Sequence, residues 1–180
     1  QACASVHREH SIVLGCYTRQ RVFIYDVTDP RLAGVKEVTA AHELLHAIYE
    51  RMSTKEKEEI NVQLRNTASS IEDQRFKDTM AEYKRTSPDQ LENELYSIIG
   101  TEIAVIPGRL EVHYAKHFQN RALIVSFAKQ YETTFTKLTD QIKEYDTKLA
   151  NLADRKDKLE VDLQTLQKSL ESNRKALDSL

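Results

Sequence analysis

Two histidines and a glutamate within five consecutive residues form the part of the sequence best suited to chemistry. His42 and His46 are four residues apart, and Glu43 directly follows the first of them. On a helix this spacing places both imidazoles on one face, one turn apart, where they could be two ligands of a tetrahedral zinc ion. Glu43 would lie beside the open coordination position, where it could take a proton from a zinc-bound water and pass it to a leaving amine. The pattern predicts zinc-dependent peptide-bond hydrolysis.

A catalytic zinc ion needs a third protein ligand, and the sequence offers several candidates. Glu94 and Glu102 lie two turns apart on a strongly amphipathic segment, and His113 and His117 follow it. No His-x-x-Gly-x-x-His extension follows His46, which excludes a metzincin. The residues alone leave the third ligand open.

The segment His42-Glu43-Leu44-Leu45-His46, followed by Asn93-Glu94-x-x-Ser97, resembles the gluzincins, the clan of thermolysin-like metallopeptidases. Those enzymes take the third ligand from an Asn-Glu pair on a later helix. The resemblance therefore implies His42, His46 and Glu94 as Zn²⁺ ligands and Glu43 as the general base. It covers these two motifs and the order of strand and active-site helix, and it identifies no family within the clan.

The sequence departs from the gluzincin pattern four residues after Glu94. Thermolysin-like enzymes have an aspartate there that orients the first histidine, whereas this chain has Ile98. Ligating histidines usually donate their second N–H to a carboxylate or carbonyl, so another acceptor is expected. Glu102 is a candidate because it lies on nearly the same helix face as Glu94. If the roles are reversed, Glu102 is the ligand.

A polar group that stabilises the transition state is also expected near the zinc ion. Tyr114, His117 and Arg121 are spaced by three and four residues and would share one helix face. Tyr114 and His117 are the candidates, because a tyrosine or histidine in this role would fit the clan. The alternative is a polar surface stripe beside a packed tyrosine.

Hydrophobic patterning predicts the elements that must position these residues. Residues 11–17 and 21–27 are rich in β-branched and aromatic residues and predict a hairpin, and residues 36–52 predict the active-site helix. The strand at 22–27 could pair with an extended peptide substrate or could be a plain core strand. Further helices are expected at about 53–66, around 71–80, at 89–105 and from 109 onward. The predicted fold is α+β and mostly α, with a small N-terminal β-hairpin or sheet packed on the active-site helix and further helices, followed by a long C-terminal coiled-coil helix.

The C-terminal segment has a seven-residue hydrophobic repeat, which predicts a left-handed coiled coil. Lys156 and Asn173 are its two polar core residues and could set register or oligomeric state. Such a seam needs a partner helix, and residues 138–180 are therefore expected to form a homo-oligomer or to pair with another helix. The a positions are Ile142, Leu149, Lys156, Leu163, Leu170 and Leu177, and the d positions are Leu138, Tyr145, Leu152, Leu159, Leu166, Asn173 and Leu180.

These patterns predict two parts: a small zinc metallopeptidase domain at residues 1–127 and a coiled-coil helix at residues 128–180. The expected activity is that of an endopeptidase acting on a peptide or protein substrate. The alternative is a coiled-coil assembly or tethering module whose zinc site is structural or inactive. A water molecule in the fourth coordination position would favour hydrolysis, whereas a fourth protein ligand would favour a structural site.

Composition and cysteine content bear on compartment and partners. The net charge of −2 and the absence of a basic stripe argue against nucleic-acid binding, and no 18-residue apolar run could span a bilayer. The chain begins at Gln1 and is interpreted as a fragment of a longer protein. Cys3 and Cys16 are either unrelated thiols or one disulfide bond, and a disulfide would indicate an oxidising compartment. We therefore expect an extracytoplasmic or membrane-anchored protein of a bacterial-type cell surface.

Overall fold

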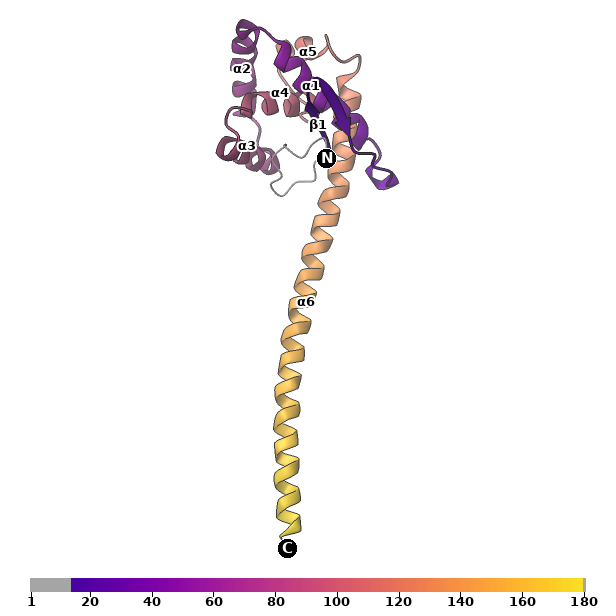
Figure 1. Cartoon of the computed structure of the whole chain (residues 1–180), viewed down its shortest axis with the longest axis vertical. Coiled ribbons are helices and arrows are strands. Elements are labelled where there is room, and N and C mark those ends of the chain that lie inside the picture. The colour runs from indigo at the N-terminus through magenta and orange to yellow at the C-terminus, as the bar shows by residue number, and fades with distance from the viewer. Residues whose placement is uncertain (1–13, 180) are drawn as a thin grey trace. The chain divides into compact units, whose positions relative to one another are not determined.

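The computed structural model describes residues 14–179, and these are mostly helical with one β-hairpin near the N-terminal end (Figure 1). This confirms the α+β, mostly α class with a hairpin packed on the helix that carries His42 and His46 and a long C-terminal helix. The hairpin strands and a short 3₁₀ helix come first, followed by α-helices. The elements are β1 (Gly15–Thr18), β2 (Arg21–Ile24), η1 (Pro30–Leu32), α1 (Val35–Arg51), α2 (Thr54–Ala68), α3 (Gln74–Thr86), α4 (Leu91–Thr101), α5 (Gly108–Tyr114) and α6 (Arg121–Asp178).

The hairpin pairs β1 with β2 in antiparallel fashion, with Gly15 opposite Ile24 and Thr18 opposite Arg21. Its two turn residues are Arg19 and Gln20, which both have positive φ angles, of 51° and 61°. Two consecutive positive φ angles are typical of a type I′ turn, whose twist matches that of the flanking strands. The turn therefore fixes the register without a glycine.

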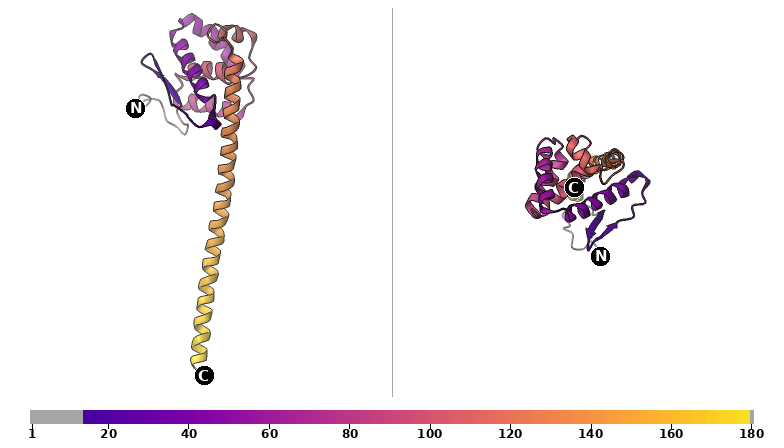
Figure 2. Two further views of the ribbon diagram at one scale, coloured as in Figure 1. Left: turned by 90° about the vertical axis from the view of Figure 1, so that its right-hand side faces the viewer. Right: turned by 90° about the horizontal axis from the view of Figure 1, so that it is seen from above.

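Helix α1 lies between the hairpin and the other helices of its unit, as the right-hand view of Figure 2 shows. A side chain at Gly15 would clash with Thr39 and Glu43, so β1 lies directly on α1. On the opposite side, a side chain at Gly100 would clash with Leu45, so α4 also approaches α1 closely. The helix that carries both histidines is thus held from two sides.

The hydrophobic core lies between α1, α2, α4 and α5. Its largest completely buried side chains include Leu45 on α1 and Tyr96 on α4, and Phe76 contributes from α3. Helix α2 begins at the predicted capping box: Ser53 accepts from the backbone of Glu56, and the Glu56 carboxylate accepts from the backbone of Ser53. Packing in this core fixes α1 and α4 relative to each other, and the capping box fixes where α2 begins.

The prediction of one continuous helix from residue 109 onward is wrong. Helix α5 ends at Tyr114, a turn follows, and α6 begins at Arg121. The Asn120 side chain accepts a hydrogen bond from the backbone N–H of Leu123, which is the capping interaction that begins a new helix. No proline or glycine marks this break, so the hydrophobic pattern did not reveal it. Helix α4 also ends earlier than predicted, at Thr101.

The described residues form two compact units, the first ending at Thr134 and the second beginning at Phe135. The predicted domain boundary at 127/128 lies inside α6 and stays a prediction. None of the helices within residues 14–179 combines the length and apolar composition that a transmembrane segment requires. Cys16 is buried and disulfide-bonded, whereas Cys3 lies outside the described residues.

Candidate metal centre

The side chains of His42, His46 and Glu94 form a cluster that could hold a metal ion. One ligand atom from each residue lies within 4.8 Å of the others. The Nε2 atom of His42 is 3.5 Å from one Glu94 carboxylate oxygen, and the Nε2 atom of His46 is 3.4 Å from the other. The three side chains are 13–19 % exposed, so the cluster is largely shielded but still open to solvent. Two imidazole nitrogens and a carboxylate are a donor set that suits Zn²⁺.

Two helices bring these ligand atoms together. His42 and His46 lie one turn apart on α1, and Glu94 lies in the first turn of α4. The close approach of the two helices at Gly100 lets a side chain from one reach side chains on the other. The position of the third ligand therefore depends on packing between segments about 50 residues apart in the sequence.

The second histidine, His46, has polar partners in Asn93 and Ser97, which flank Glu94 in the sequence, whereas the aspartate of the gluzincin pattern orients the first histidine. The Nδ1 atom of His46 is 3.0 Å from Oδ1 of Asn93 and 3.2 Å from Oγ of Ser97. If Nδ1 carries the proton and donates to Asn93, the Nε2 lone pair is directed at the metal position. Ile98, which stands where an aspartate was expected, is buried in the core instead.

Glu102 takes neither of the roles considered for it in this structure. Its carboxylate pairs with Arg75 on α3 at 2.6 Å, and Arg75 also pairs with Glu132 at 3.0 Å. Glu94, and not Glu102, is the carboxylate that lies with the two histidines.

Glu43 is buried beside the cluster and lies against β1. Its residue is 7 % exposed, and burial raises the pKa of its carboxyl to about 6. The backbone N–H of Tyr17 donates to the carboxylate, which opposes this increase in pKa. The strand that contacts Glu43 is therefore β1.

Strand β2 was considered above as a substrate edge or a core strand. It has no buried residue and is not a core strand.

Tyr83 on α3 is a member of the site that the sequence analysis missed. Its hydroxyl forms a hydrogen bond with the Glu94 carboxylate, and burial and the charges of Glu94 and Glu43 raise the pKa of this phenol. Burial alone would raise the pKa of Glu94, but its contacts with His42, His46 and Tyr83 lower it below its usual value. The phenol is thus a neutral donor beside an ionised carboxylate. A lone tyrosine on a mixed polar helix carries no spacing signal that could have revealed it.

The structure does not bring Tyr114 or His117 to this cluster. Tyr114 is completely buried, and its hydroxyl donates to the backbone carbonyl of Tyr96 at 2.7 Å. The ring of His117 packs edge-on to that of His113, at 5.5 Å between centroids. His113 in turn has its Nε2 atom 2.9 Å from the Tyr96 hydroxyl.

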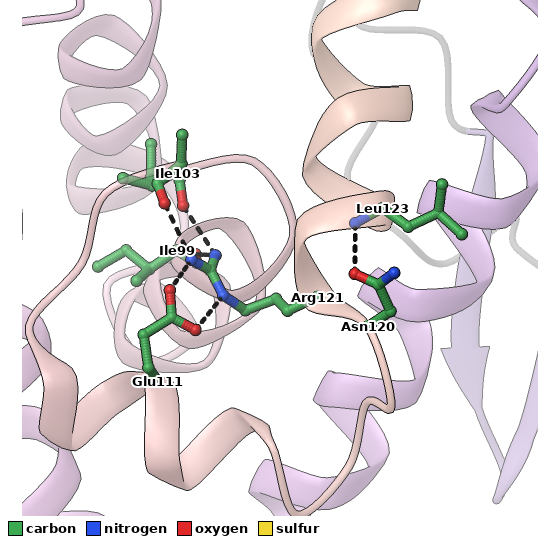
Figure 3. Close-up of polar contacts among 7 residues, drawn as sticks. Ile99, Ile103, Glu111, Asn120, Arg121 and Leu123 are labelled. Atoms are coloured by element: carbon green, nitrogen blue, oxygen red, sulfur yellow. Dashed lines mark hydrogen bonds and ion pairs between the residues drawn. The ribbon is translucent and has the colours of Figure 1, made fainter.

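Arg121 is also engaged elsewhere, as Figure 3 shows. Its guanidinium donates to the backbone carbonyls of Ile103 and Ala104 at 2.8 and 3.1 Å and pairs with the Glu111 carboxylate. A longer bond of 3.4 Å reaches the carbonyl of Ile99. The expected shared face is absent because Tyr114 ends α5 whereas Arg121 begins α6.

No protein-family model, curated protein or solved structure matched this chain. The resemblance to gluzincins therefore stays a prediction from two short motifs.

Proposed function

We propose that this protein is a zinc-dependent peptidase in which Glu43 is the general base. The observation that carries the proposal is the convergence of His42, His46 and Glu94, with one ligand atom of each within 4.8 Å of the others. These are the residues that the His-Glu-x-x-His and Asn-Glu motifs single out. Their donor atoms suit Zn²⁺, and a buried carboxylate lies beside them.

A zinc ion held by these three side chains would polarise the substrate carbonyl and acidify a bound water molecule. Glu43 would accept the proton from that water and deliver it to the leaving amine. Asn93 and Ser97 would hold the His46 ring in a fixed orientation, because both contact its Nδ1 atom. Tyr83 would orient Glu94 through the hydrogen bond to its carboxylate.

The test compares the zinc-loaded full chain with Glu43→Gln on a diverse peptide library, with cleavage products identified by mass spectrometry. Glutamine has a similar shape but cannot accept and return a proton, so we expect cleavage to fall by about 10²–10⁴-fold. Zinc affinity, measured by competition with a chromogenic chelator, should stay within about threefold because Glu43 is not a ligand.

Glu50→Gln is the matched control, since Glu50 is an exposed glutamate on the same helix. It should cleave like the wild-type protein. Equal cleavage by Glu43→Gln and the wild type would contradict the assigned base. Failure of the zinc-loaded wild type to cleave any peptide would contradict the peptidase proposal and favour a structural zinc site.

We also propose an extracytoplasmic location. The supporting observation is the disulfide bond of Cys16, because disulfides persist mainly in oxidising compartments.

A further inference from the structure

The second unit carries a long exposed apolar stripe. From residue 139 to residue 179 every residue is exposed, including the leucines at the heptad core positions. These leucines are 55–71 % exposed, whereas isolated surface leucines on a protein are common but long contiguous rows are not. We call the following set the α6 stripe: Leu149, Leu152, Leu159, Leu163, Leu166, Leu170 and Leu177.

Two polar residues interrupt the α6 stripe and limit how two copies could pair. Lys156 is at an a position and Asn173 is at a d position. In a parallel pair, identical positions face each other, so Lys156 would face Lys156 of the second copy inside the seam. Two ammonium groups at such a site repel each other and lose hydration, which makes this arrangement unfavourable.

In an antiparallel pair, a positions of one helix face d positions of the other. Lys156, at an a position, then does not face Lys156 of the second copy. One register places Lys156 against Asn173 of the second copy, twice by symmetry. The same register places Leu152 against Leu177, Leu159 against Leu170, and Leu163 against Leu166. Both polar residues then meet each other, and every other core layer from residue 152 to residue 177 is leucine on leucine. The asparagine carbonyl can accept from the lysine ammonium, so no layer contains two like charges.

We propose that the α6 stripe is the interface of an antiparallel homodimer in which Lys156 of each copy faces Asn173 of the other. Seven leucines from each copy at more than half exposure correspond to an interface on the order of 1,200–2,000 Å². The occupant is thus a second copy of this same helix, and the two polar residues fix its direction and register.

Distances between spin labels in the full-length protein test direction and register together. Thr165 and Asn151 are both exposed c positions of the heptad, so labels there have matched surroundings. The proposed register is symmetric about a point between residues 164 and 165. Two Thr165 labels should therefore lie close together across the dimer. Two Asn151 labels should be about 40 Å apart, because 27 residues of helix separate them along the axis.

A parallel dimer would give short and equal distances at both sites, which would overturn the proposal. A chain that sediments as a monomer at hundreds of micromolar while the helix remains formed would also overturn it and assign the stripe to a different partner. Sedimentation equilibrium of the same samples distinguishes these outcomes from weak dimerisation.

Charge substitutions at Asn173 provide an independent test that leaves the apolar layers intact. With Asn173→Glu, the carboxylate of each copy would face Lys156 of the other, which gives two ion pairs per dimer. We therefore expect dimerisation to become roughly tenfold tighter. Asn173→Lys would face Lys156 instead, and we expect dimerisation to become at least tenfold weaker. In a parallel dimer residue 173 faces itself, and both substitutions would weaken association. Weakening by Asn173→Glu would therefore overturn the antiparallel assignment even if a dimer forms.

Discussion

At the scale of single residues, the orientation of His46 depends on two side chains that are not ligands. Asn93 and Ser97 both contact its Nδ1 atom from the α4 face that carries Glu94. The spacing in Asn93-Glu94-x-x-Ser97 therefore serves two purposes on one helix. It places Glu94 in the cluster and it holds His46 from another helix.

Removing these two contacts should weaken metal binding. We expect Asn93→Ala/Ser97→Ala to lower zinc affinity by about 10–100-fold, because the imidazole of His46 would lose its fixed orientation and tautomer. Competition with a chelator of known affinity measures this. Asn66→Ala, at an exposed asparagine at the end of α2, should bind zinc like the wild type. Unchanged affinity in the double variant would show that His46 is held by its helix alone.

The sequence selected His42 and His46 by their spacing and offered Glu94 through the resemblance, with Glu102 as the alternative; the structure brings the first three together. Their spacing is a local property of each helix, and the Asn-Glu pair supplied the link between the helices through the resemblance. Tyr83 and the contact between Tyr17 and Glu43 could not be predicted, because each depends on how a separate element packs against the site.

At the scale of elements, Arg121 joins the start of α6 to the end of α4. Its side chain is 6 % exposed and donates to the carbonyl of Ile99 in the last turn of α4 and to those of Ile103 and Ala104 in the segment that follows. Glu111 on α5 balances the charge. One side chain thus connects three helices around the segment that follows α4.

Replacing this arginine should destabilise the fold without changing a residue of the candidate metal centre. We expect Arg121→Met to lower the free energy of unfolding by about 2–4 kcal/mol, because three buried or part-buried hydrogen bonds to carbonyls and the pairing with a carboxylate are lost. Chemical denaturation followed by circular dichroism measures this. Arg109→Met, at an exposed arginine on α5, should change stability by no more than about 0.5 kcal/mol. A similarly small change for Arg121→Met would contradict the role of Arg121 in stabilising this junction.

Elements were predictable where hydrophobic periodicity is long, as in α1 and α6, or where a capping box marks a helix start, as at Ser53. They were not predictable at the break between α5 and α6. Asn120 caps the new helix, but an asparagine inside a helical pattern is equally compatible with continuation.

At the scale of the whole molecule, unfolding in mild acid should depend on His113. Its Nε2 atom lies within hydrogen-bonding distance of the hydroxyl of Tyr96, a completely buried residue. Only a neutral imidazole can accept this hydrogen bond. Burial, together with the charges of His117 and Lys116, lowers the pKa of His113 to about 4. An unfolded chain would protonate the same group near its ordinary pKa of 6.5.

The unfolded state therefore binds more protons than the folded state between pH 6.5 and 4, and stability falls as the pH decreases through this window. The contribution of His113 is complete above pH 6.5 and amounts to about 1–2 kcal/mol after allowing for its partial exposure. His113→Gln keeps an acceptor near the Nε2 position but does not titrate. We expect the metal-free variant to lose less stability than the wild type between pH 7 and 4 in urea unfolding experiments. Parallel curves for the two proteins would contradict this assignment.

Gly100 has a consequence for which ions the molecule can hold. Any side chain at this position would meet Leu45 and Tyr114 and push α4 away from α1. The three donor atoms come from these two helices, so the distances between them follow from the separation of the helices. Zinc requires bonds of about 2.0–2.2 Å, whereas calcium accepts about 2.3–2.6 Å. If the cluster holds a metal ion as proposed, a residue with no donor atom of its own would help to set which ionic radius fits, and a larger residue there would favour ions of larger radius.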